Sequence, residues 1–126
     1  MGVRDRYVRL PNEGEGHRSV FEGFLRLTRR FEPELWTLLL VLLILDVLLT
    51  VYGVRIGLTE GNPIARAALD RFGAPGLLAL KGVSLGIAFC GWTLVDARFR
   101  ALVPLGISVV WAFAVAVNAL LIVAVL

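Results

Sequence analysis

Three long apolar runs constrain this chain more than any other feature. They cover residues 35–54, 74–95 and 101–126; Asp46 interrupts the first, Lys81 interrupts the second, and the third carries no charge. A helix needs about 20 residues to cross roughly 30 Å of hydrocarbon, so each run is long enough to span a membrane. The runs do not alternate and are too few to close a β-barrel. The sequence therefore predicts an all-α integral membrane protein, with a three-helix bundle over residues 35–126.

Composition agrees with a membrane protein. Hydrophobic residues make up 58% of the 126 residues and charged residues 18%, against about 45–50% and 25% in soluble domains. An ordinary soluble enzyme and a disordered chain are therefore excluded. Cys90 is the one cysteine and His17 the one histidine, which excludes an internal disulfide and most histidine-based metal or haem chemistry. We expect no cofactor and no metal site.

Residues 1–34 hold most of the charge and form a separate basic segment. Within it, Val20, Phe24, Leu27 and Phe31 recur at helical spacing, and arginines fill the other side of that helix. An aromatic-rich apolar face opposite arginines suits an amphipathic helix in the headgroup region of a membrane. A short helix packed on a partner protein is the alternative, and the membrane span that follows favours the membrane surface.

The stretch between the first two runs predicts a second short helix. Asn62 is a good N-cap, Pro63 suits the first helical position, and Gly73 is a natural stop. About eleven residues cannot cross a bilayer. The prediction is a short helix that lies on the membrane surface.

The distribution of Lys and Arg predicts which way round the chain sits. Nine of these residues lie in the N-terminal segment and the 96–100 loop, against three in residues 55–73. By the positive-inside rule the N-terminus is cytoplasmic and the C-terminus is external or periplasmic, in the cell (inner) membrane. The isoelectric point of about 9.8 could also indicate nucleic-acid binding. Because the basic residues cluster beside a span, anionic lipid at the cytoplasmic face is the expected partner instead.

Three polar residues lie at similar depth in the three runs. Asp46 lies eight residues before Val54, Lys81 seven after Ala74, and Asn118 eight before Leu126. At about 1.5 Å per residue, each is some 10–12 Å below the outer boundary. An unpaired charge near the bilayer centre costs about 2.5–3.5 kcal/mol. We therefore predict an Asp46–Lys81 ion pair, with Asn118 hydrogen-bonded to it.

Two further residues are expected to join this polar cluster. Thr50 follows Asp46 by four residues and Ser84 follows Lys81 by three, so each shares a helix face with its charged neighbour. The cluster could only fix helix register, as buried polar residues do, or it could be a proton, ion or ligand site. The structural lock is favoured, and the functional interpretation stays open.

Small residues and tryptophans predict how the helices pack. Gly82, Gly86 and Cys90 recur every four residues, as do Ala112 and Ala116, and such rows let helices approach closely in lipid. Three tryptophans also have expected positions. Trp36 and Trp92 fall near the cytoplasmic boundary, where aromatic belts form, and Trp111 shares a face with Asn118.

Two short elements resemble a family. Asp46–Thr50 has the pattern D-x-x-x-T, and Glu60-Gly61-Asn62-Pro63 has the pattern E-x-N-P, with Lys81 in the next run. This resembles a family of small prokaryotic membrane proteins of unknown function, over about residues 35–95. The resemblance implies that Asp46, Thr50, Glu60, Asn62 and Pro63 are signature positions, and it implies no activity. Taken locally, Glu60 is a carboxylate just ahead of a helix N-terminus.

Three functions remain to be weighed. An accessory or scaffolding subunit of a membrane complex, without catalytic activity, fits the small size, the packing rows and the lack of a recognisable catalytic set. Its partners would be other membrane subunits or further copies of the chain. A small transporter or ion-conducting oligomer, using Asp46, Lys81 and Asn118, is the alternative. An intramembrane enzyme is disfavoured because no serine, cysteine or histidine arrangement has reachable partners.

Overall fold

The computed structural model describes residues 13–126 and contains four α-helices and no strand over that range. These are α1 (Glu13–Arg30), α2 (Glu32–Arg55), α3 (Pro63–Leu94) and α4 (Leu102–Val125). Helices α2, α3 and α4 are each long and apolar enough to cross a membrane. The part of the basic segment before residue 13, which includes Arg4, Arg6 and Arg9, lies outside the described residues.

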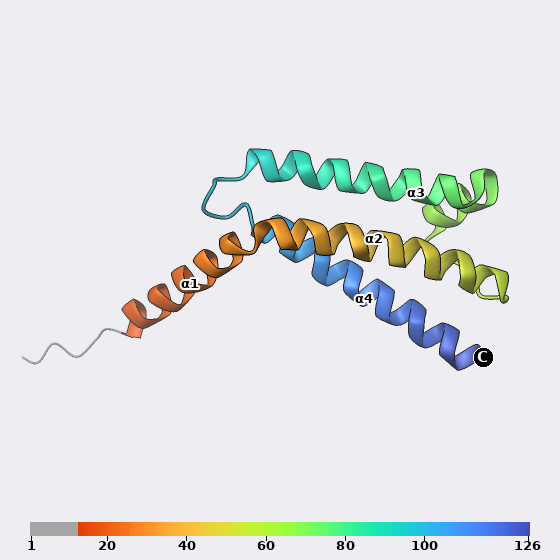
Figure 1. The fold of residues 1–126 in the computed structure, drawn as a ribbon, viewed down its shortest axis with the longest axis horizontal. Coiled ribbons are helices and arrows are strands. Elements are labelled where there is room, and N and C mark those ends of the chain that lie inside the picture. The colour runs from red at the N-terminus through yellow and green to blue at the C-terminus, as the bar shows by residue number, and fades with distance from the viewer. Residues whose placement is uncertain (1–12) are drawn as a thin grey trace, which may run out of the picture.

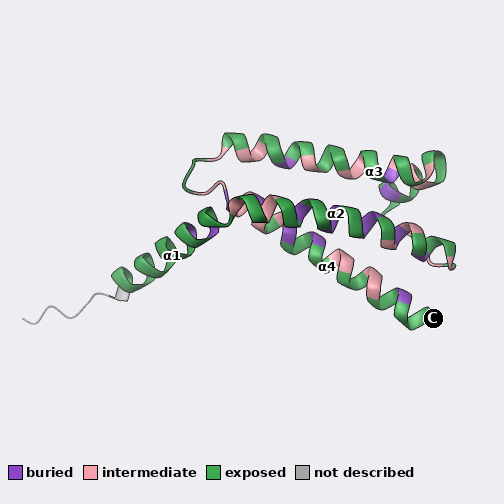
Figure 2. Ribbon diagram, in the orientation of Figure 1, coloured by how far each residue is buried: buried purple, intermediate pink, exposed green. Residues whose placement is uncertain are grey.

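Helix α1 is an amphipathic helix that begins at Glu13, before the apolar stripe from which the sequence predicted it. It points away from the other helices at the end where the 95–101 connection lies (Figure 1). Only Leu25 and Thr28 are buried on it, while Val20, Phe24 and Leu27 remain exposed. Figure 2 shows this as a helix that is green along most of its length. The predicted apolar stripe is therefore left uncovered by the rest of the described chain.

Helix α2 is the centre of the fold. Its buried residues form one stripe at helical spacing: Leu39, Leu42, Leu43, Asp46, Val47, Thr50 and Gly53. Pro33 lies in the first turn, where its missing N–H costs nothing. The helix ends in a Schellman motif, with Gly57 at φ 101° and Leu58 N–H donating to Gly53 O at 2.9 Å. This ending reverses the chain, so that the 56–62 loop runs back alongside the last turns of α2 before α3 begins.

Helix α3 has two limbs that meet at a sharp reversal. Gly73 has φ 67° and ψ −154°, so the helical path breaks there, between a short limb (63–72) and a long limb (74–94). A side chain at Gly76 would come within 2.5 Å of the Ala68 carbonyl oxygen. The two limbs therefore pack closely only because this position lacks a Cβ.

The short limb differs from the predicted surface helix. Ala65 is 3% exposed and packs in the same buried cluster as Leu39, Leu77 and Trp111. The short limb thus folds back beside the long limb toward α2 (Figure 1). The reason is local: the small Ala65 side chain allows close approach, and Gly73 permits the reversal because its φ is positive.

Helix α4 packs along α2. Pro104, Ser108, Trp111 and Ile122 are its buried residues, and its other side is exposed. The two helices run in the same direction (Figure 1), and Ile122 near the end of α4 lies 3.8 Å from where a Cβ on Gly53 of α2 would stand. α1 and the 95–101 connection lie at one end of the molecule, and Leu126 and the 56–62 loop lie at the other.

Candidate functional site

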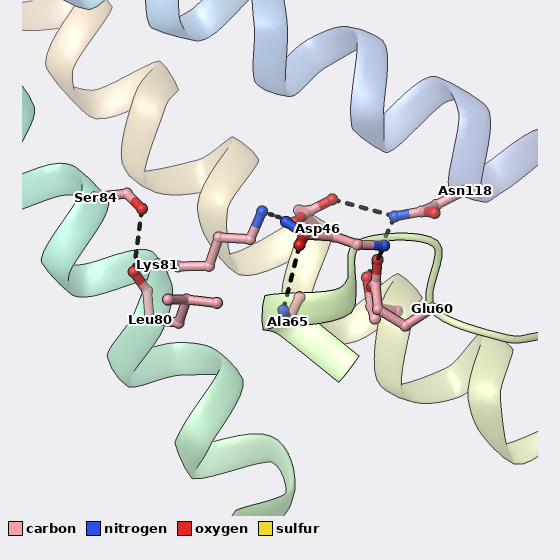
Figure 3. Close-up of polar contacts among 9 residues, drawn as sticks. Asp46, Glu60, Ala65, Leu80, Lys81, Ser84 and Asn118 are labelled. Atoms are coloured by element: carbon pink, nitrogen blue, oxygen red, sulfur yellow. Dashed lines mark hydrogen bonds and ion pairs between the residues drawn. The ribbon is translucent and has the colours of Figure 1, made fainter. Parts of the chain in front are cut away.

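The candidate site is built around Asp46, in the middle of the buried stripe of α2. The residue is 3% exposed, and both carboxylate oxygens have partners. Oδ2 lies 2.6 Å from Lys81 Nζ, and Oδ1 accepts a hydrogen bond from Asn118 Nδ2 at 3.1 Å (Figure 3). The ion pair and the amide contact predicted from equal depth are therefore present.

Lys81 reaches this carboxylate from the long limb of α3. Its Nζ also lies 5.5 Å from the centroid of the Trp111 ring on α4, close enough for a cation–π interaction. The side chain is 21% exposed, against 5% for Asp46. The ammonium group therefore joins all three long helices and is the more open member of the pair.

Asn118 connects the ion pair to Thr50. Its Nδ2 donates to Thr50 Oγ1 at 3.3 Å as well as to Asp46. Thr50 lies one turn beyond Asp46 and is 7% exposed. Of the five predicted cluster residues, Asp46, Thr50, Lys81 and Asn118 come together as expected. Trp111, which was expected to share a face with Asn118 and to pack in the bundle, is buried and contacts Lys81 of the same cluster.

Ser84 does not join the cluster. Its hydroxyl is exposed and donates to the Leu80 carbonyl oxygen of its own helix at 3.1 Å (Figure 3). A short serine side chain bonds readily to the preceding turn. Lys81 reaches α2 because it is long, whereas Ser84 on a neighbouring position cannot cover that gap. The prediction for Ser84 was therefore wrong.

The second sequence element, Glu60-Gly61-Asn62-Pro63, makes hydrogen bonds that fix the shape of the loop before α3. The Glu60 carboxylate accepts from Asn62 N–H at 2.8 Å, and Asn62 Oδ1 accepts from the N–H groups of Ile64 and Ala65 at 3.0 and 3.5 Å. Arg66 donates to the Glu60 carbonyl oxygen from Nε at 2.8 Å. The predicted N-cap at Asn62 and the proline at the first helical position are confirmed.

These two elements line one pocket, which the sequence did not predict. It has a volume of about 440 Å³, and its polar lining consists chiefly of Asp46, Thr50, Glu60, Asn62, Lys81 and Asn118. Apolar residues that include Phe113 and Val117 complete the wall. The reversal at Gly73 brings the loop to this depth. The positive φ there leaves only a weak signal in the sequence, two glycines that flank Ala74-Pro75.

The predicted packing rows are not used between the described helices. Gly82 and Gly86 have no atom within 4 Å of where a Cβ would stand, and Cys90 is exposed. Ala112 and Ala116 are exposed as well. The rows therefore face outward and leave room for something outside the described chain.

Aromatic residues hold the other end of α3 against α2. Trp36 on α2 lies 6.0 Å from Phe89 and 6.1 Å from Trp92 between ring centroids. Trp92 Nε1 also donates to the Glu32 carboxylate. The two tryptophans expected in an aromatic belt are thus packed on each other near the 95–101 connection.

The chemistry available at the site is that of a paired carboxylate and ammonium group beside an amide. Residues 13–126 contain no group of three or more His, Cys, Asp or Glu side chains placed to hold a metal ion. Lys81 lines the pocket and has ammonium hydrogens beyond the one directed at Asp46, and within residues 13–126 the second Glu60 carboxylate oxygen accepts no hydrogen bond. The site is therefore suited to hydrogen bonding and charge pairing.

Comparison with known proteins places residues 37–124 in a family described as Domain of unknown function (DUF5658). No curated protein and no solved structure matches the chain. The matched region extends beyond the expected 35–95 and takes in α4, so Asn118 lies within it. Helix α1 lies outside it. The prokaryotic origin and the role of the two elements as family signatures stay predictions.

Proposed function

The chain belongs to the DUF5658 family, and on that premise we propose that it is a non-catalytic accessory or scaffolding subunit of a membrane complex. The cluster of Asp46, Lys81, Asn118 and Thr50 locks its helices together. The N-terminus is cytoplasmic, α1 lies in the headgroup region of the cell (inner) membrane, and the C-terminus is external.

One observation carries the proposal. Both carboxylate oxygens of Asp46 are paired inside the chain, whereas the α3 face that carries Gly82 and Gly86 contacts no other part of the described chain. Gly82 and Gly86 would accept side chains without touching anything in the described chain. In lipid, such faces allow the backbones of two helices to come close, and association then follows from packing. The partner on this face is a helix of another membrane subunit, or of a second copy.

The test is purification of the tagged chain from native membranes in mild detergent. We expect a co-purifying membrane protein, or a homo-oligomer, whose recovery falls with Gly86→Leu. Gly106→Leu is the matched control, because Gly106 on α4 is equally open. Stability of the isolated chain should be the same for both variants. A monomer without a partner, or equal recovery in the two variants, would contradict the proposal.

A second candidate function rests on the pocket. Asp46, Lys81 and Glu60 line a half-open cavity of about 440 Å³, which is an arrangement suited to a proton, ion or ligand path. Three helices enclose no pore, so transport would require an oligomer. Flux into liposomes, compared between the native chain and Asp46→Asn, decides this candidate, and absence of flux under any imposed gradient would end it.

A further inference from the structure

Two neighbouring hollows lie where α1 meets the beginning of α2 and the 95–101 connection. The first has a volume of about 260 Å³ and is lined by Glu22, Leu25, Arg26, Arg29 and Arg98. The second, of about 450 Å³, is lined by Arg29, Glu32, Pro33, Trp36, Phe89 and Trp92. Arg29 lines both hollows, so they adjoin at this side chain, and neither includes the residues of the Asp46 cluster.

The first hollow is strongly basic. It gathers three guanidinium groups against one carboxylate, and Glu22 is already paired with Arg98 at 3.2 Å. No hydrogen bond or ion pair within residues 13–126 involves the guanidinium groups of Arg26 and Arg29. Guanidinium forks match the geometry of phosphate oxygens and bind them bidentately. The net positive lining therefore favours a phosphate group in a molecule of net negative charge.

The second hollow is aromatic. Phe89 and Trp92 are stacked with ring centroids 5.4 Å apart, and Trp36 meets both rings edge-on. Its acidic residue, Glu32, already accepts a hydrogen bond from Trp92. An apolar wall next to a phosphate site suits an amphiphile better than a free ion, because a free ion would leave the aromatic surface unused.

The position of the hollows matches the depth of lipid headgroups. Pro33 and Trp36 lie in the first turns of α2, where the span begins, and Phe21, Phe24 and Leu27 are exposed on α1, which precedes it. If α2 crosses the bilayer, this level is the boundary between phosphates and acyl chains.

We propose that these hollows bind one anionic phospholipid. Its phosphate lies among Arg26, Arg29 and Arg98, and an acyl chain runs along Trp36, Phe89 and Trp92. The inference depends on the placement of α1 at the membrane surface and is independent of the role as a subunit. A lipid held in this way would fix the angle between α1 and the spanning helices.

The test measures lipid binding to the full chain in detergent, by native mass spectrometry with phosphatidylglycerol, phosphatidylcholine or inorganic phosphate as the probe. We expect phosphatidylglycerol to bind at least about tenfold more tightly than phosphatidylcholine, because the net positive lining favours a molecule of net negative charge. Tenfold corresponds to about 1.4 kcal/mol. Inorganic phosphate should bind far more weakly than the lipid. Binding of inorganic phosphate with equal strength would contradict a lipid site.

Charge-matched variants separate a specific site from general attraction to a negative surface. Arg26→Gln with Arg29→Gln should weaken phosphatidylglycerol binding about tenfold or more. Arg18→Gln with Arg30→Gln removes the same charge from α1 outside the hollows and should change binding about twofold or less. Equal losses in the two pairs would overturn the proposal, as would retained binding in the first pair.

A third variant is expected to raise the affinity for phosphatidylglycerol instead of lowering it. Glu22→Gln releases Arg98 from its ion pair, so phosphatidylglycerol binding should become tighter. All five positions are exposed, and none is in the buried core, so the fold is expected to be unchanged. If lipid binding behaves as described but no partner co-purifies, the subunit proposal fails and this inference stands.

Discussion

The contact between α2 and α4 and the contact between α2 and α3 differ in the kind of interaction that dominates each. Leu39, Leu42 and Leu43 of α2 pack with Trp111 of α4 in one buried cluster. α3 adds Ala65 and Leu77 to that cluster, and Ala88 is its one other buried residue. Its specific contacts with α2 are the Lys81–Asp46 ion pair and the aromatic group around Trp36. Figure 2 shows the long limb of α3 exposed along most of its surface.

This difference shows what positions a helix in lipid. Acyl chains are as apolar as leucine, so an apolar contact between spans gains little from leaving the solvent. Polar groups have no alternative partner in hydrocarbon, so they favour one arrangement strongly. α4 is placed by extended packing along α2 together with the hydrogen bonds of Asn118, whereas α3, with fewer buried residues, depends mainly on a few directional contacts. Each prediction below tests that contrast.

The largest effect is expected from breaking the ion pair. Asp46→Ala or Lys81→Ala leaves one charge unpaired within the membrane, which costs about 2.5–3.5 kcal/mol. Removing both should cost less than either single change. Unfolding by sodium dodecyl sulfate in mixed micelles, followed by circular dichroism, measures the three free energies. Additive losses would mean that this pair does not hold α3.

A substitution at the reversal of α3 comes next. Gly76→Ala puts a Cβ within 2.5 Å of the Ala68 carbonyl oxygen, and overpacking of this kind costs about 1–3 kcal/mol. Gly82→Ala is the matched control, because a Cβ there meets no atom within 4 Å. The same unfolding measurement should show a loss for Gly76→Ala only. Equal stability of the two variants would show that the limbs are not closely packed.

A smaller loss is expected at the aromatic end of α3. Trp92→Phe keeps a ring beside Trp36 but removes the hydrogen bond to Glu32, which is worth about 1 kcal/mol at a partly exposed position. Trp92→Leu removes the aromatic contact as well and should be less stable than Trp92→Phe. Circular dichroism is preferred as the readout because the variants change tryptophan fluorescence. No loss in either variant would leave the ion pair as the main specific contact of α3.

The smallest effect, of opposite sign, is expected on α4. Ser108 is 3% exposed, and its hydroxyl has no hydrogen-bond partner within residues 13–126. Ser108→Ala removes an unsatisfied buried group and should leave stability unchanged or raise it by up to about 1 kcal/mol. A marked loss of stability would mean that Ser108 makes a polar contact that helps to position α4 beyond those of Asn118, and the contrast between the two interfaces would weaken.

The sequence predicted the polar layer because each helical residue adds a fixed rise of about 1.5 Å, so depth in the membrane follows from residue number. Asp46, Lys81 and Asn118 could be compared by counting residues from the span ends, and burial of charge in hydrocarbon required partners. The N-cap at Asn62 followed from local chemistry in the same way. Ser84 was misplaced because position on a helix face does not state how far a side chain reaches.

The convergence of the two sequence elements could not be predicted by counting. It depends on the φ of Gly73 and on the space around Gly76, which are properties of one reversal and not of a repeating pattern. A stretch of eleven residues between spans is too short to cross a bilayer, so a surface position was the simplest expectation. Only the folded path brings Glu60 and Asn62 to the depth of Asp46.

The join between α1 and α2 has a mechanical consequence. Phe31 alone separates the two helices, and one backbone hydrogen bond ties it to each of them: Phe31 N–H donates to Leu27 O of α1 at 3.3 Å, and Leu35 N–H of α2 donates to Phe31 O at 2.9 Å. A junction of one residue couples the direction of α1 to that of α2, and a lipid bound between them would strengthen that coupling. We therefore expect a change in the tilt of α2, such as a thinner bilayer would cause, to swing α1 in the same movement.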